Sequence, residues 1–123
     1  RITDVCANIN GFRTPRSPDY IKHAWYKFYT FLRPELLKEG WDRQRFVLAI
    51  KERGVPCMSG SCSEVYLENA FEGTNLRHKQ RLEIAKELGE TSIMFVIHPT
   101  LLDNEIQKTC DVIKEVAKEA FKS

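Results

Sequence analysis

The stretch that decides the fold is Ala24-Trp-Tyr-Lys-Phe-Tyr-Thr-Phe-Leu32, which is denser in aromatic residues than any other part of the chain. Aromatic and β-branched residues favour strands, and Arg33-Pro34 ends this one because proline cannot donate to a strand ladder. Its alternating faces are Trp25, Lys27, Tyr29 and Phe31 on one side and Tyr26, Phe28, Thr30 and Leu32 on the other. Both faces are largely apolar, which predicts a strand that is covered on both sides or meets a partner on one.

Further strands and two helices follow on the C-terminal side of this stretch. Val55–Met58 is predicted to form a short strand and the β-branched run Thr91–Ile97 a longer one. A helix is expected from Asp42, a good N-cap, to Arg53, with Gly54 as its stop. The apolar spacing of Ile106, Cys110, Ile113, Ala117 and Ala120 predicts a final helix to about Phe121, capped by Asp103 or Thr100.

The remaining segments are predicted as short helices and a linker. Two short helices are expected at Ser63–Phe71 and Arg77–Leu88, with Gly89 ending the second, and a linker at Phe12–Tyr20. The chain opens directly with the helical spacing Ile2, Cys6, Ile9, closed by Asn10-Gly11. So short a helix is marginal alone, which favours a piece excised from a longer protein, with residues 1–11 as the remnant of an inter-domain helix.

The order of these elements predicts an α+β fold. We expect a two-layer sandwich in which a three-stranded, mainly antiparallel sheet carries helices on one face. The 123 residues are enough for one domain, which we place at residues 12–123.

Composition excludes several classes of protein. With 42% hydrophobic and 29% charged residues and a net charge of +2, the chain is neither disordered nor basic enough to announce a nucleic-acid partner. Its apolar runs are too short for a membrane span. The four scattered cysteines, Cys6, Cys57, Cys62 and Cys110, are expected to be reduced structural thiols. These features predict a cytoplasmic protein without membrane or nucleic-acid partners.

The sequence contains no recognisable motif of catalytic residues. Phosphate-cradling glycine loops are absent, and Cys57 and Cys62 lack the spacing of a zinc or thioredoxin site. The three histidines, His23, His78 and His98, show no metal-binding spacing. We therefore expect no catalytic residue, no cofactor-binding residue and no metal site within these residues, although a nucleophilic pair of Cys57 or Cys62 with a histidine stays open.

Two alternative functions are compatible with these elements. Tyr26, Phe28 and Tyr29, beside Lys27 and Arg33, could stack bases in a nucleic-acid-binding module. The other alternative is a stand-alone α+β domain that senses a ligand or mediates dimerisation.

Three groups of residues together resemble a known family. They are His23-Ala-Trp-Tyr-Lys-Phe-Tyr29 with Gly40-Trp-Asp-Arg43, the run Glu52-Arg-Gly-Val-Pro-Cys-Met-Ser-Gly-Ser-Cys-Ser-Glu-Val-Tyr66, and His98-Pro-Thr-Leu-Leu-Asp-Asn-Glu-Ile106. In order and spacing they resemble the C-terminal small domain of the DegT/DnrJ/EryC1/StrS-type sugar aminotransferases, from about Gly11 to Ala120.

This resemblance implies a bacterial enzyme dependent on pyridoxal phosphate, whose missing N-terminal domain holds the cofactor and its lysine, and which works as a homodimer. The present residues would help to form the nucleotide-sugar pocket and close the cofactor cleft, would bind no cofactor and would be inactive alone. The turn Ser59-Gly60-Ser61 would bind substrate. Many members have His-Tyr at Gly60-Ser61 and Ser-Leu-Pro-Leu at Met94–Ile97, so the particular sugar is left open.

Overall fold

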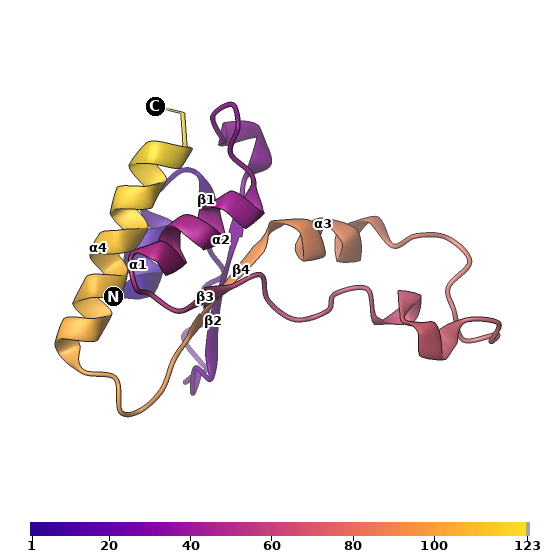
Figure 1. Cartoon of the computed structure of the whole chain (residues 1–123). Coiled ribbons are helices and arrows are strands. Elements are labelled where there is room, and N and C mark those ends of the chain that lie inside the picture. The colour runs from indigo at the N-terminus through magenta and orange to yellow at the C-terminus, as the bar shows by residue number, and fades with distance from the viewer. Residues whose placement is uncertain (123) are drawn as a thin grey trace.

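The computed structural model describes residues 1–122 and consists of a four-stranded antiparallel sheet with helices packed against it (Figure 1). The strands are β1 (Phe12–Arg13), β2 (Lys27–Leu32), β3 (Cys57–Met58) and β4 (Ser92–Val96), in the spatial order β1-β2-β4-β3. The expected three strands are therefore present, and the α+β class is confirmed. The fourth, β1, lies in the expected linker, where Phe12 pairs with Leu32 in a ladder of only two residues.

One face of the sheet carries the hydrophobic core. Phe28, Thr30 and Leu32 of β2 are buried on this face, and Ile93 and Phe95 of β4 lie beside them. Helices α1 (Ile2–Ala7), α2 (Arg43–Glu52) and α4 (Asp103–Ala120) cover this face. The two-layer arrangement follows from this amphipathic packing.

The ends of these helices follow local chemistry. The Asp42 side chain accepts a hydrogen bond from the Arg45 amide at 2.7 Å, so it caps α2 as expected. Gly54 ends α2 with φ +75°. Neither Asp103 nor Thr100 caps α4, because Leu102 is its N-cap and donates its amide to Glu105 Oε2 at 2.8 Å.

Two glycines have roles other than the expected helix stops. Gly11 does not adopt a positive φ; a Cβ there would overlap the Phe121 ring, so close packing selects it. Gly89 does not end its helix, since α3 (Glu83–Thr91) continues past it. A Cβ at Gly89 would overlap Ser63 Oγ, so this glycine permits the close approach of the preceding segment.

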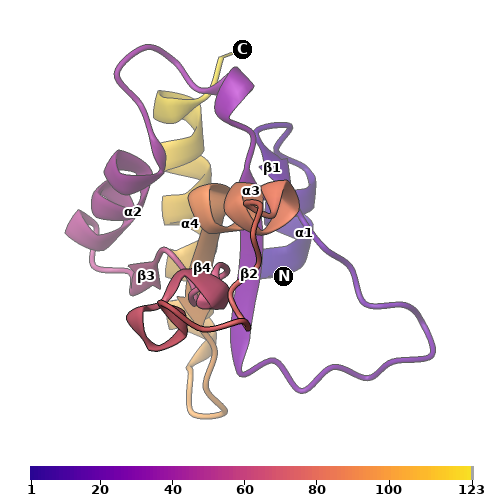
Figure 2. The same ribbon diagram turned by 90° about the vertical axis from the view of Figure 1, so that its right-hand side faces the viewer.

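Residues 59–82 form an arm that projects from the sheet on the side away from α4 (Figure 1). Seen from this side, α3 and the arm lie in front of the sheet and α4 lies behind it (Figure 2). The expectation of helices on one face is therefore correct for α1, α2 and α4 but not for α3. The expected helix Ser63–Phe71 is also wrong: it is two single 3₁₀ turns, Val65–Leu67 and Asn69–Phe71, separated by extended Glu68.

Across residues 1–122, none of the helices has both the length and the apolar composition needed to cross a membrane.

Candidate functional site

The turn Ser59-Gly60-Ser61 leaves the edge strand β3 and begins the arm. Gly60 adopts φ +94°, a conformation that favours glycine. Ser59 and Ser61 are exposed, and Gly60 is half-buried. The turn therefore presents two hydroxyl groups and a bare stretch of backbone to solvent at the junction of body and arm.

Two residues of the sheet hold this turn in place. Ser92 Oγ, buried in β4, donates to the carbonyl oxygen of Ser59 at 2.7 Å. The Tyr29 hydroxyl lies 2.9 Å from Ser61 Oγ. A Cβ on Gly60 would lie 2.9 Å from Ser92 Oγ and 3.0 Å from Tyr29 Cε1, so the glycine packs directly on the same two residues.

Tyr29 and Ser92 were not identified from the sequence as parts of the site. Both lie on the sheet face opposite the core. Tyr29 is 32 residues before Ser61 in the chain, and Ser92 is 33 residues after Ser59. The pairing of Phe31 with Ser92 in the β2–β4 register brings both strands under the turn. The apolar spacing of each strand indicates a buried segment but says nothing of a loop that returns over it.

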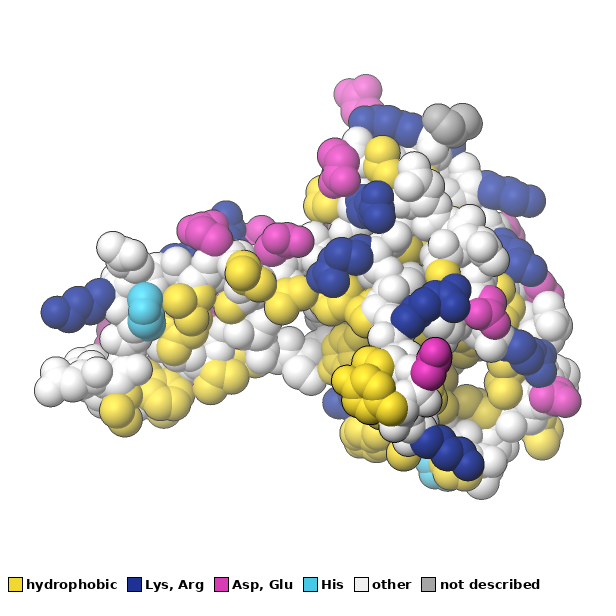
Figure 3. All heavy atoms as spheres, turned by 180° about the vertical axis from the view of Figure 1, so that it is seen from behind, with side chains coloured by type: hydrophobic (Ala, Val, Ile, Leu, Met, Phe, Trp, Pro, Cys, Tyr) yellow, Lys and Arg dark blue, Asp and Glu magenta, His cyan; other side chains and the backbone are white. Residues whose placement is uncertain are grey.

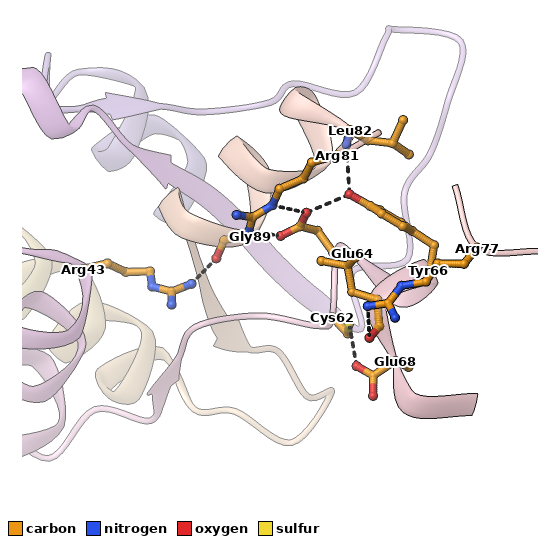
Figure 4. A network of polar contacts seen from close by, with 10 residues as sticks. Arg43, Cys62, Glu64, Tyr66, Glu68, Arg77, Arg81, Leu82 and Gly89 are labelled. Carbon is orange, nitrogen blue, oxygen red and sulfur yellow. Dashed lines mark hydrogen bonds and ion pairs between the residues drawn. The ribbon is translucent and has the colours of Figure 1, made fainter. Parts of the chain in front are cut away.

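The arm is held in shape by a polar network around Glu64 (Figure 4). Arg81 donates to both carboxylate oxygens of Glu64, at 2.8 and 2.7 Å, a two-pronged ion pair. Tyr66 donates its hydroxyl to Glu64 at 2.8 Å and accepts the Leu82 amide at 2.9 Å. The hydrogen bonds from Arg81 lower the pKa of Glu64 to about 2, so the carboxylate stays charged at neutral pH.

This network corrects an interpretation of the charges in the arm. The spacing of Glu64, Glu68 and Glu72 indicates a solvated helical face, and Arg81 is expected on another helix turn. In the structure the Glu64 side chain is only 15% exposed, because it joins the two limbs of the arm through Arg81. The pair is distant in sequence and lies outside any helix, so helical spacing could not reveal it.

The cysteines do not form a reactive or metal-binding group. Burial raises the pKa of both Cys6 and Cys57 to about 12. The exposed Cys62 donates its thiol to Glu68 at 3.2 Å, and this hydrogen bond raises its pKa. In the part of the chain that the structure describes, no three His, Cys, Asp or Glu side chains are grouped as a metal site requires.

The aromatic residues of β2 do not form one surface for stacking bases. Phe28 is 2% exposed and belongs to the core, whereas Tyr29 lies on the opposite face and contacts Ser61. The Arg13 guanidinium covers the Phe31 ring at 4.1 Å from its centroid. This arrangement does not favour the nucleic-acid-binding alternative, because Tyr26 stands exposed without Phe28 beside it.

The surroundings of Lys27 do not provide the partners that pyridoxal phosphate needs. Lys27 lies in β2 with its Nζ 5.3 Å from the centroid of the Tyr26 ring. Within residues 1–122 it forms no ion pair with a carboxylate, and no buried side-chain nitrogen or oxygen lacks a partner. A covalently bound cofactor needs a lysine beside groups for its phosphate and ring nitrogen, and this donor set is not assembled around Lys27.

The fold agrees with comparisons to solved structures. An aminotransferase from Psychrobacter cryohalolentis is 44% identical over 96% of this chain, with a TM-score of 0.89. The aminotransferase TlmJ from Streptoalloteichus hindustanus and a DegT DnrJ EryC1 StrS aminotransferase from Brucella abortus, both 15% identical, match 96% and 93% of the chain with TM-scores of 0.76 and 0.73. These two show the likeness of fold alone.

The fold is thus that of an aminotransferase small domain. The resemblance to the DegT/DnrJ/EryC1/StrS-type aminotransferases expected from the sequence is confirmed. The chain spans about a third of the length of these enzymes: 32%, 29% and 28% of the three chains. No model of a known protein family matches the sequence. No curated protein sequence matches it either.

Proposed function

We propose that residues 12–123 are the C-terminal small domain of a pyridoxal-phosphate-dependent sugar-nucleotide aminotransferase. Residue 123 lies outside the described part of the chain. Residues 1–11, which include α1 and the turn after it, are then the remnant of the segment that joins this domain to an N-terminal domain holding the cofactor. The observation that carries the proposal is the 44% identity to an aminotransferase over 96% of this chain.

In this proposal the turn Ser59-Gly60-Ser61 contacts the nucleotide sugar, and the domain closes the cofactor cleft of a cytoplasmic, bacterial homodimer. Small residues with exposed hydroxyls and backbone amides suit close approach to a sugar or a phosphate. The turn is rigid before substrate arrives, because Ser92 and Tyr29 already hold its two ends. A preorganised turn loses little conformational entropy on binding, which favours affinity.

The test uses the longer protein that carries this chain, assayed with nucleotide sugars. Ser61→Ala is expected to raise KM roughly twofold to tenfold with kcat less affected, because a lost hydrogen bond to a ligand costs roughly 0.5–1.5 kcal/mol. Tyr29→Phe is the matched control, since it removes the intramolecular partner and leaves the Ser61 hydroxyl available to substrate. A KM unchanged by Ser61→Ala, or raised equally by both variants, would contradict contact between Ser61 and substrate.

A further inference from the structure

A cleft of about 320 Å³ lies between α2 and β3, beside the turn. It is lined by Arg43, Gln44, Val47 and Lys51 from the helix and by Met58 and Ser59 from the strand and turn. Ser59 is therefore shared by the cleft and the candidate substrate turn. A ligand that contacts the turn at Ser59 would therefore also contact this cleft.

The chemistry of the cleft is cationic and polar. Its lining holds a guanidinium, an ammonium, an amide and a hydroxyl, and no carboxylate. Among the residues that the structure describes, neither Arg43 nor Lys51 forms an ion pair, whereas Arg53, the residue after α2, pairs with Glu115 and Glu119. The two cations of the cleft therefore keep their charge available for an anion.

The position of Arg43 is set by a second element. Its guanidinium donates one N–H to the carbonyl oxygen of Gly89 in α3, as Figure 4 shows. A guanidinium has five N–H donors, so others remain for a ligand. The Gly89 carbonyl oxygen is thus a fixed acceptor for the half-buried Arg43 side chain, which is held in position without any ligand.

The spacing of the cations indicates the size of the anion. Arg43, Val47 and Lys51 follow each other at intervals of four residues and so share one face of α2. Eight residues of helix correspond to about 12 Å. Two flexible side chains rooted that far apart match an extended anion, such as a diphosphate, better than a single small ion.

We propose that this cleft binds the phosphate groups of an extended phosphorylated ligand, with Arg43 and Lys51 as the contacting cations. Ser59 then lies where the phosphates join the part of the ligand that reaches Ser61. That these phosphates belong to a nucleotide sugar rests on the proposed function; the affinity of the cleft for a diphosphate does not.

A different cationic hollow provides the main competitor for such an anion. Lys114, Lys118 and Lys122 line a hollow of about 410 Å³ beside α4 and Phe121. Lys122 Nζ donates to the Glu35 carbonyl oxygen, and Lys114 lies 3.8 Å from Asp111. Because the Asp111 carboxylate lies beside Lys114, whereas no carboxylate lines the α2–β3 cleft, we expect the anion to prefer the α2–β3 cleft.

The experiment titrates inorganic pyrophosphate into the isotope-labelled 123-residue chain at low salt and follows backbone amides by NMR. The expected result is saturable shifts centred on Val47, Met58 and Ser59. Lys51→Gln, a substitution at an exposed position of α2, should weaken binding about tenfold, since it removes a charge-assisted hydrogen bond to the anion. Arg43→Gln should weaken it as well.

Lys108→Gln is the matched control, because it makes the same charge change on α4 in a hollow that contains Glu105. The proposal would be overturned by any of three results. These are equal weakening by Lys51→Gln and Lys108→Gln, shifts centred on residues 114–122, and the absence of saturable binding. A different result would separate this proposal from the proposed function. If the 123-residue chain binds pyrophosphate at the cleft but the longer protein binds no nucleotide sugar, the cleft is still an anion site and the proposed function is wrong.

Discussion

Cys62 is the exposed cysteine of the four, and it differs from the others in what controls its reactivity. The thiolate is the reactive form of cysteine, and burial raises the pKa of Cys6 and Cys57 to about 12. We expect iodoacetamide at pH 8 to label native protein at Cys62 alone, as read by peptide mapping. Glu68→Gln should increase the labelling rate several-fold, because Glu68 now holds the Cys62 thiol protonated. Native labelling at Cys57, or a rate that is insensitive to Glu68, would contradict this account.

Gly60 and Gly73 provide a matched pair for measuring how firmly the turn is packed. Both adopt a positive φ, +94° and +71°, but a Cβ at Gly73 would meet nothing within 4 Å. Gly73→Ala should lower the free energy of unfolding by roughly 1–2 kcal/mol through backbone strain alone. Gly60→Ala should cost about 1 kcal/mol or more in addition, because its Cβ would press on Ser92 and Tyr29. Equal costs in chemical denaturation would show that the turn is loosely packed.

Among the elements, the arm is the one whose order depends on polar contacts. Its apolar side chains Val65, Leu76 and Leu82 are exposed rather than buried (Figure 3 shows the arm from behind). Arg81→Gln removes the ion pair with Glu64, and we expect chymotrypsin to cleave the arm near Tyr66 and Phe71 about tenfold faster than in the unaltered protein. Arg77→Gln is the control, because Arg77 makes only a 3.4 Å contact to the Leu67 carbonyl oxygen. Equal cleavage of both variants would contradict a special role for the Glu64–Arg81 pair.

The same ion pair predicts a dependence of the arm on pH. The pKa of Glu64 falls from 4.5 to about 2 in the folded protein, chiefly through the hydrogen bonds from Arg81. A carboxyl group with a lowered pKa stabilises the fold above its unfolded value and loses that contribution as the pH falls towards its folded value. We therefore expect the amide signals of Tyr66 and Leu82 to show the arm opening between about pH 4.5 and 2. If the arm is already open to the same extent at pH 6, protonation of Glu64 is not what opens it.

Elements with a periodic apolar face could be predicted from the sequence, and the arm could not. β2, α2 and α4 bury one regular face each, so their spacing in the chain reflects the core directly, and β4 is recognisable as a short run that is buried on both faces. The arm has no core to pack on, and its shape depends on Glu64, Tyr66 and Arg81. The role of Gly89 could not be predicted either. A side chain at this position would overlap Ser63, which lies 26 residues earlier in the chain. Within the candidate site, the sequence indicated the turn but not the two sheet residues that hold it.

At the scale of the whole molecule, the proposed division of substrate binding and cofactor binding between two domains leads to a prediction about pyridoxal phosphate. A cofactor lysine needs neighbours for the phosphate and the ring nitrogen, and Lys27 faces the ring of Tyr26 instead. We expect borohydride treatment of the 123-residue chain with pyridoxal phosphate, followed by peptide mapping, to give low-yield adducts spread over exposed lysines such as Lys51, Lys108 and Lys118. Lys27→Arg should leave the total yield nearly unchanged. One stoichiometric adduct, at Lys27 or at any other lysine, would mean that this chain itself holds the cofactor, and the division of labour between two domains would then be wrong.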